Sequence, residues 1–478
     1  MPQDDPSARH GLPHAEALAA FCANLSATDA PARVRRRAAL HLLDTLGAAL
    51  AGTCSTEFRA VRSLAAPDGP ALLLGTGQRT GARDAALVNG VAAHVFELDD
   101  SGGCDHTGAV VLPALLAALG GMTVPVSGND FLSAWLAGYD VGRRVLDASG
   151  GYGAHNGAGW HSTGTCGTLA AAAAVARLRG YDAAMTRQAL TLATSFSSGL
   201  WAFIHDGSQA KKIHAGRAAE GGLLAADLVR AGISGPSLVF DEVWGGFFQS
   251  FTHTADPQAL SRDLGRDWMI ERASLKPYAA CRGAHSAIDA VADILAATGR
   301  EAAQIAAIDL RLAPFLMDMC GSARLETLAG AQMSLGYALA VQRVFGRVDL
   351  AQYANAARDD SRVAAFIPQV RFHPDPAMDQ MSEPVVTVTF TDAATRTDSQ
   401  LIEWDAKRSM IKINPVVGWS HDEAERYAAE HGVFMNPLRE LGFASIGCEP
   451  CTRPVGTGED PRAGRWANSD KVECGLHI

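Results

Sequence analysis

The stretch DAPARVRRRAALHLLDTLGAALAG, residues 29–52, decides the fold class of this chain. Its apolar residues recur at the spacing of one helix face: Val34, Ala38, Leu42, Leu46 and Ala49. Thr28 or Asp29 is the expected N-cap, Pro31 fits the first turn, and Gly52 is the expected end. The pattern therefore predicts a long, Ala- and Leu-rich helix.

Further helical patterns of the same texture follow along the chain. They cover residues 85–96, 110–119, 130–146, 168–177, 183–195 and 215–231. Small apolar residues occupy nearly every face of these segments, which favours close packing of helix against helix. We therefore expect a large all-helical domain over residues 1–268.

The texture changes twice after this region. Residues 308–312 and 386–390 alternate between β-branched or apolar and polar side chains, and they flank helical patterns at 284–297 and 332–344. This combination predicts a smaller α+β domain over residues 269–397. Residues 398–478 are richer in turns and tryptophan, and they form a third segment. The predicted fold class is mainly α.

Composition narrows the possible partners. The 478 residues carry a formal net charge of −10, which argues against a nucleic acid or an anionic membrane surface as the main partner. No stretch approaches the ~18 uninterrupted apolar residues of a membrane span, and Met1–His14 has no apolar signal region. Six of the nine cysteines are scattered singly, unlike a disulfide framework. These features predict a cytoplasmic protein.

Two polar clusters interrupt the apolar helices. The first is Glu97-Leu98-Asp99-Asp100-Ser101, followed by His106, and the second is the sequence GWHSTG at 159–164, which contains His161. Carboxylates beside a histidine can transfer protons or bind a metal, and a histidine titrates near neutral pH. The alternatives are a solvated helix end for the first cluster and a structural histidine for the second.

Two further clusters concentrate positive charge. They are AKKIHAGR at 210–217 and KPYAACRGAH at 276–285, and they contain Lys211, Lys276 and His285. Lysines neutralise carboxylates as point charges, so these clusters suit a polycarboxylate ligand, although each could also be a solvated basic face. The glycines at 75, 77 and 81 are spaced one residue too widely for a dinucleotide fingerprint.

Several of these strings together resemble one family. LDTLGAALAG at 43–52, Asn89-Gly90 with the acidic cluster at 97–100, GWHSTG, AKKIHAGRAAEGG at 210–222 and KPYAACRGAHSAIDA at 276–290 resemble the MmgE/PrpD family over roughly residues 10–395. Members include 2-methylcitrate dehydratase, cis-aconitate decarboxylase and iminodisuccinate epimerase. The resemblance implies a helical domain with an α+β lid, a homodimer, and a polycarboxylate substrate handled without a cofactor.

The resemblance also implies site residues between the two domains. The matching positions are Glu97, Asp100, Ser101, His106, His161, Lys211, Lys276 and Tyr337. The sequence departs from the family in three places: Glu97 stands where Asp is usual, the segment from Asp100 to His106 is shorter, and Thr107 follows His106 where Pro is commoner. These departures bear on the reaction type more than on the family.

The chemistry of these activities assigns provisional roles. Each reaction passes through a carbanion-like centre next to a carboxylate, which Lys211, Lys276 and His285 could neutralise. His161 is the expected base or acid, with Glu97 or His106 orienting it or completing the proton transfer. We expect a lyase or an isomerase, and the choice among dehydration, decarboxylation and epimerisation stays open.

The last 78 residues resemble a different family. GFASIGCEPCTRPV at 442–455 and ECGLH at 473–477 resemble the C-terminal part of adenylylsulfate and phosphoadenylylsulfate reductases. The resemblance implies that Cys448 and Cys451 are ligands of a four-iron four-sulfur cluster and that Cys474 is a reactive thiol. Such a cluster takes four thiolates, and the chain has no adjacent Cys-Cys pair, so no cluster is expected. The alternatives to a carboxylate enzyme are a reductase-related function or an inactive fusion.

Overall fold

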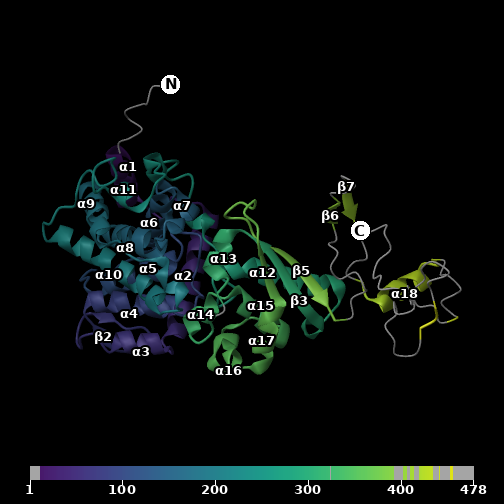
Figure 1. The fold of residues 1–478 in the computed structure, drawn as a ribbon. Helices are drawn as coiled ribbons and strands as arrows, with labels where there is room; N and C mark the ends of the chain where they lie inside the picture. Colours follow the sequence, from purple (N-terminus) through teal and green to yellow (C-terminus); the bar gives the residue numbers. More distant parts are fainter. Residues whose placement is uncertain are drawn as a thin grey trace, which may run out of the picture. The chain divides into compact units, whose positions relative to one another are not determined.

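The computed structural model describes residues 11–322, 324–391, 402–405, 410–413, 419–433, 441 and 453–455. The chain separates into two compact units, residues 1–388 and 389–478. The first unit holds a large helical part, here residues 11–275, and a smaller part that we call the lid, residues 276–388 (Figure 1, purple to teal and green). The predicted boundary at 397/398 lies among residues that the structure does not describe.

The helical part confirms the mainly α fold class. Its α-helices are α1 Gly11–Asn24, α2 Ala32–Gly52, α3 Thr56–Arg62, α4 Ala82–His94, α5 Thr107–Gly120, α6 Gly128–Ala148, α7 Gly151–Gly157, α8 Ser162–Leu178, α9 Ala183–Ala193, α10 Ala210–Arg230 and α11 Phe247–Phe251. Short 3-10 helices and one hairpin complete it: β1 Ala71–Leu72, β2 Arg79–Thr80, η2 Thr194–Phe196, η3 Trp201–His205, η4 Pro257–Leu260 and η5 Met269–Arg272.

The lid is built around a three-stranded sheet in the order β4-β3-β5. Its strands are β3 Ile305–Leu312, β4 Val370–Pro374 and β5 Val385–Phe390, whose end lies past the boundary at 388, and β3 pairs with β4 in parallel. Its helices are η6 Arg282–Ala284, α12 His285–Thr298, η7 Ala302–Gln304, α13 Pro314–Cys320, α14 Leu328–Gln332, α15 Leu335–Phe345, η8 Leu350–Tyr353, α16 Asn355–Arg358, α17 Ser361–Phe366 and η9 Ile367–Gln369. The lid therefore has the predicted α+β character.

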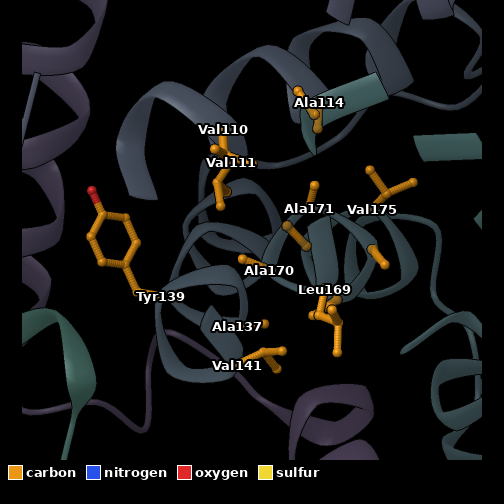
Figure 2. Close-up of a cluster of buried hydrophobic side chains, with 14 of the residues drawn as sticks. Val110, Val111, Ala114, Ala137, Tyr139, Val141, Leu169, Ala170, Ala171 and Val175 are labelled. Carbon is orange, nitrogen blue, oxygen red and sulfur yellow. The ribbon is translucent and has the colours of Figure 1, made fainter. Parts of the chain in front are cut away.

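Small side chains let three central helices pack closely. Figure 2 shows this core, in which α5, α6 and α8 meet through valine, alanine and leucine side chains. The labelled residues are Val110, Val111, Ala114, Ala137, Tyr139, Val141, Leu169, Ala170, Ala171 and Val175. All are buried, so the apolar residues of these segments form the interior of the helical part.

The start of α2 differs from the prediction. Neither Thr28 nor Asp29 caps this helix, because Pro31 occupies the N-cap position and no side chain bonds to the first backbone N–H groups. The guanidinium of Arg35 instead donates to the carbonyls of Thr28 and Ala30, which fixes the preceding turn. Elsewhere side-chain caps are present, as at Ser127 before α6.

The crossing of α4 and α10 depends on two glycines, and this gives a stability prediction. A Cβ on Gly90 would lie 2.5 Å from the Cα of Gly216, so Gly90→Ala should push the helices apart and lower the unfolding free energy by about 1–3 kcal/mol. Gly47→Ala in α2, which meets nothing within 4 Å, should instead stabilise by about 0.4–1 kcal/mol. Chemical denaturation measures both; equal effects would contradict the packing argument.

The second unit is described only in part. Strands β6 Ile402–Asp405 and β7 Met410–Ile413 form an antiparallel pair, and α18 His421–Glu430 follows. Ser420 caps α18 in a reciprocal capping box with Glu423. No helix in the described part of the chain is both long and apolar enough to cross a membrane.

Candidate active site

A cavity of about 340 Å³ has walls from both the helical part and the lid. The helical part contributes polar residues that include Glu97, Ser101, Asp105, His106, Arg143, Lys211 and Arg272. The lid contributes Cys281, Arg282, Phe315, Met319 and Glu383, with others. A cavity of this size suits a small ligand.

One buried carboxylate organises the floor of this cavity. Glu97 Oε1 lies 2.5 Å from Lys211 Nζ and 2.6 Å from Lys212 Nζ, and Glu97 Oε2 lies 3.0 Å from Lys276 Nζ. Burial raises the pKa of the Glu97 carboxyl, but the three ammonium groups outweigh it and hold that pKa well below its usual range. Glu97 is therefore ionised, and it neutralises part of the lysine charge.

The backbone explains how Glu97 reaches the lysines. Helix α4 ends at His94, and Glu97 three residues later has a φ of 54°, in the left-handed region that few non-glycine residues adopt. Such a conformation costs about 1–3 kcal/mol and persists where surrounding contacts enforce it. Here the three ion pairs enforce it, and the strain turns the carboxylate toward the start of α10.

Asp99 links two histidines beside this carboxylate. Its side chain accepts from His94 Nδ1 at 3.1 Å and lies 2.9 Å from His106 Nδ1. The remaining ring nitrogen of His106, Nε2, lies 3.3 Å from Lys211 Nζ and 3.5 Å from Asp105 Oδ2. Burial lowers the pKa of His106, but the carboxylates of Asp105 and Asp99 raise it more, so the net shift is upward. The raised pKa favours the protonated form of His106, which lines the cavity.

His161 sits behind Asp105 rather than on the cavity wall. Its Nε2 lies 3.5 Å from Asp105 Oδ2, and its Nδ1 lies 2.9 Å from Nδ1 of His214. Burial lowers the pKa of His161 to about 4, so its ring is neutral near pH 7. His161 thus reaches the cavity wall through Asp105, and its predicted role as base or acid stays a prediction.

The structure brings four of the nine predicted carboxylate-enzyme residues onto the cavity wall. These four are Glu97, Ser101, His106 and Lys211. Lys276 and His161 each contact a wall residue from behind. The remaining three make their contacts elsewhere.

Asp100, His285 and Tyr337 have structural partners. Asp100 is fully buried, where its carboxylate accepts from the Tyr139 hydroxyl, and it also lies 3.1 Å from His41 Nδ1. His285 Nε2 lies 3.1 Å from the carbonyl oxygen of Ala280. The Tyr337 hydroxyl donates to a backbone carbonyl within the lid. Their predicted substrate contacts stay predictions.

Sequence reasoning missed several residues of the site, including Lys212, Asp105, Cys281 and the wall arginines Arg143 and Arg272. Lys212 is buried against Glu97, and burial lowers its pKa to about 8. Asp105 connects His106 with His161, and Cys281 lines the lid side of the cavity. The paired lysines at the start of an Ala- and Gly-rich helix were an available signal for Lys212, because charged side chains are rarely placed on such a helix without a partner.

Two groups of side chains have the donor atoms of a metal site. They are His94 with Asp99 and His106, and Asp105 with His106 and His161. In the first group, both histidines already face the Asp99 carboxylate through Nδ1. In the second, the ammonium of Lys211 lies 3.3 Å from His106 Nε2 and would repel a cation. In both groups the donor atoms therefore already have a partner or lie beside a cation.

The buried histidines predict a loss of stability in acid. Burial lowers the pKa of His161 and His155 to about 4 and that of His214 and His285 to about 3, from an ordinary value of 6.5. The unfolded chain therefore binds more protons between pH 6.5 and about 3, and the folded state loses stability as the pH falls through this range. His106 has the opposite effect on stability as the pH falls, because its pKa is raised.

Each tenfold change in proton affinity is worth about 1.4 kcal/mol, so we expect a loss of several kcal/mol between pH 6.5 and pH 4. Thermal unfolding followed by circular dichroism at pH 7.5 and pH 4.5 measures it. The variant His373→Gln, at an exposed position on β4, should show the same pH dependence as the parent. A melting temperature that is equal at the two pH values would contradict the expectation.

The three cysteines of the predicted reductase-like segment, Cys448, Cys451 and Cys474, lie outside the described residues. Their roles stay predictions. Six other cysteines are free thiols. Cys54 is exposed, and the other five are buried: Cys22, Cys104, Cys166, Cys281 and Cys320.

Comparison with known proteins matches successive parts of the chain to different domains. The MmgE/PrpD N-terminal domain matches residues 16–260, and the MmgE/PrpD C-terminal domain matches residues 278–408. A phosphoadenosine phosphosulfate reductase domain matches residues 390–454, so residues 390–408 fall in both matches.

Individual relatives follow this division. The cis-aconitate decarboxylase-like protein oryM of Aspergillus oryzae is 32% identical over 375 residues, which cover 73% of this chain and 77% of that protein. The adenosine 5'-phosphosulfate reductase of Streptomyces coelicolor is 51% identical over 86 residues, 18% of this chain and 36% of that protein. The phosphoadenosine 5'-phosphosulfate reductase of Gloeobacter violaceus is 47% identical over 85 residues, which cover 17% of this chain and 35% of that protein. The chain thus spans about a third of the length of these two reductases.

Proposed function

The chain belongs to the MmgE/PrpD family, and from this premise we propose that it is a cofactor-independent lyase or isomerase acting on a small di- or tricarboxylate. The observation that carries the proposal is the charge of the cavity wall. Among the described residues, the wall has four Lys or Arg side chains and three Asp or Glu side chains, and the raised pKa of His106 favours its positively charged form. Such a wall suits a ligand with several carboxylates.

The arginines at the cavity supply planar carboxylate-binding groups. Arg143 and Arg272 both contact Asp147, at 2.8 and 3.2 Å, which orders their guanidinium groups at the edge of the cavity. On the lid side, Arg282 pairs with Glu383 at 2.6 Å. Guanidinium groups held in place can bind carboxylates through two parallel hydrogen bonds. We assign substrate binding to these arginines together with Lys211.

Decarboxylation is the first reaction to test, because the relative oryM is described as cis-aconitate decarboxylase-like. Loss of CO₂ leaves an electron pair on the substrate carbon, and a neighbouring carboxylate takes up this charge if a cation neutralises it. Lys211 is placed to supply that cation, and His106 is placed to give the proton that completes the product. Dehydration and epimerisation begin at a carbon in the same relation to a carboxylate, so the same residues serve them.

Solvent exchange separates these possibilities. The chain is incubated in deuterated water with cis-aconitate, 2-methylcitrate or iminodisuccinate, and ¹H NMR follows the product and deuterium uptake next to the carboxylates. The expected result is turnover or exchange with one of them, lost in His106→Asn and kept in the surface variant Arg217→Ala. Absence of exchange with all three would overturn the proposed substrate class.

A second function of the reductase-like segment is suggested by the domain match at 390–454. The donor set does not fit a four-iron four-sulfur cluster, because Cys448 and Cys451 supply two of the four thiolates and the adjacent Cys-Cys pair of the cluster-containing reductases is missing from the sequence. We therefore propose no reductase activity. Iron and sulfide analysis of anaerobically purified chain tests this, and a full-occupancy cluster would overturn it.

A further inference from the structure

The two halves of the active-site cavity differ in chemistry. The helical part supplies most of the charged side chains of the wall, including the cations of Lys211, Arg143 and Arg272. Among the described residues, the lid adds two charged side chains, Arg282 and Glu383, and these pair with each other at 2.6 Å. The charges of the lid half therefore cancel, and most of its other side chains are apolar.

One short helix carries most of this apolar wall. Phe315, Leu316 and Met319 of α13 line the cavity, and residues four apart are neighbours on one helix face. Tyr152 of α7 packs against this face: its ring centroid is 6.3 Å from that of Phe315, and its hydroxyl donates to Met319 Sδ at 3.8 Å. These four residues and Met381, which also lines the cavity, are called the apolar patch below.

A glycine keeps the space beside the apolar patch open. Gly283 lines the cavity next to α13. A Cβ on Gly283 would lie 2.7 Å from Leu316 Cδ1 and 2.9 Å from Met319 Cε. Any side chain at this position would therefore occupy the space that these two residues border, whereas glycine leaves it to a ligand.

Met381 extends the apolar patch to the mouth of the cavity. It belongs to the connection between β4 and β5, residues 375–384, and it is 55% exposed, whereas Leu316 is 6% exposed. The neighbouring Gln380 holds this connection against the helical part, because its Nε2 donates to the carbonyl of Gly153 in α7 at 3.3 Å. Methionine side chains are flexible and polarizable, so Met381 can adapt to an apolar chain that leaves the cavity.

We propose that the substrate carries an alkyl chain of several carbons, which lies on the apolar patch while the carboxylates face the helical part. This inference rests on the proposed function and narrows its substrate class to alkyl-substituted di- or tricarboxylates. Exposure rises from Leu316 to Met381, so the patch offers apolar surface from the interior to the mouth. A carboxylate placed against the patch would lose its water without gaining a cation, which is unfavourable.

The dependence of binding on chain length tests the proposal. Isothermal titration calorimetry of the full chain measures the Kd of succinate and of its 2-methyl, 2-propyl and 2-pentyl derivatives, which have no hydroxyl group to eliminate. The Kd should fall by about fourfold for each methylene that the patch buries, the factor that corresponds to ~0.8 kcal/mol per CH₂. A Kd that changes by less than twofold from the methyl to the pentyl derivative contradicts the proposal.

Variants of the full chain locate the effect on the patch. Met319→Ser should reduce the gain per methylene to below twofold, and Met381→Ser should weaken binding of the pentyl derivative alone, because Met381 lies at the mouth. Met317→Ser is the matched control, since Met317 is on the same helix and is not one of the residues that line the cavity. Equal gains in all three variants would remove the apolar patch from the proposal.

Folding of the variants is checked by their melting temperatures. Met381 is largely exposed, so Met381→Ser should melt like the parent and tests the patch by itself if Met319→Ser is unfolded. Succinate, which has no alkyl chain, should bind the parent and the folded variants with the same Kd.

A second series of ligands separates this inference from the proposed function. Straight-chain monocarboxylates from propionate to octanoate carry an alkyl chain and one carboxylate. If the succinates do not bind but monocarboxylates bind more tightly with length, and less so in Met319→Ser, the apolar patch stands and the polycarboxylate class is rejected. If the succinates bind and neither series depends on length, the polycarboxylate class stands and the alkyl chain is rejected. If neither series binds, both claims fall.

Discussion

Replacing Lys211 by alanine should lower turnover by ~100- to 1000-fold, the range in which removal of one positioned charge-stabilising group falls. Lys211 lies on the cavity wall. Its Nζ is 2.5 Å from Glu97 Oε1 and 3.3 Å from His106 Nε2. The variant removes the cation that faces a carbanion-like centre. It also removes a cation that lies 3.3 Å from His106 Nε2 and lowers the pKa of His106.

The effect should fall mainly on kcat, because the arginines at the cavity still bind the carboxylates in the ground state. Steady-state kinetics of Lys211→Ala with the substrate identified by exchange measures the split between kcat and KM. Arg217→Ala provides the matched control, since Arg217 lies on the same helix, is half exposed and pairs with Glu220. A Lys211→Ala rate within threefold of the parent would remove Lys211 from the mechanism.

Glu97→Gln should destabilise the protein by about 3–5 kcal/mol, which is the usual cost of removing one partner from a buried ion pair. Glu97 is fully buried and meets three lysine ammonium groups, so the amide leaves three buried cations without their shared counter-ion. The amide also offsets the energetic cost of the left-handed backbone at this position less well than the carboxylate does. Urea denaturation measures the change in unfolding free energy.

The control for this variant is Glu220→Gln, which breaks a single pair with a half-exposed arginine. Its expected cost is below about 1 kcal/mol, because water screens surface pairs. If Glu97→Gln costs no more than Glu220→Gln, the lysine cluster is neutral or hydrated in the folded protein, and the charge argument for the site falls with it.

Patterns within one helix were enough to predict most of the fold. The apolar residues of α5, α6 and α8 recur with the helical period, and their small size correctly indicated a closely packed interior. The predicted N-cap of α2 was wrong because Thr28 and Asp29 have suitable side chains, whereas Pro31 takes the cap position through its backbone. A cap depends on local backbone angles that residue type only biases.

The site was harder to predict because it depends on direction as well as on residue type. Glu97 and Asp100 are three residues apart, yet one faces the lysines and the other faces Tyr139 and His41. The left-handed turn at Glu97 separates them. Glycine is the usual residue in such a turn, so a glutamate at this position does not predict it. Lys276 joins Glu97 across 179 residues of sequence, a contact that spacing cannot show.

The contact between His161 and His214 has a consequence for hydrogen placement. Their Nδ1 atoms lie 2.9 Å apart, and burial keeps both rings neutral, so the two nitrogens share one proton. If His161 Nε2 carries its hydrogen toward Asp105, its Nδ1 must accept and His214 must be the Nδ1–H tautomer. The two imidazoles are thereby locked into opposite tautomeric forms, and one cannot switch without the other. Nitrogen-15 chemical shifts of the two rings should accordingly show two different tautomers that change together.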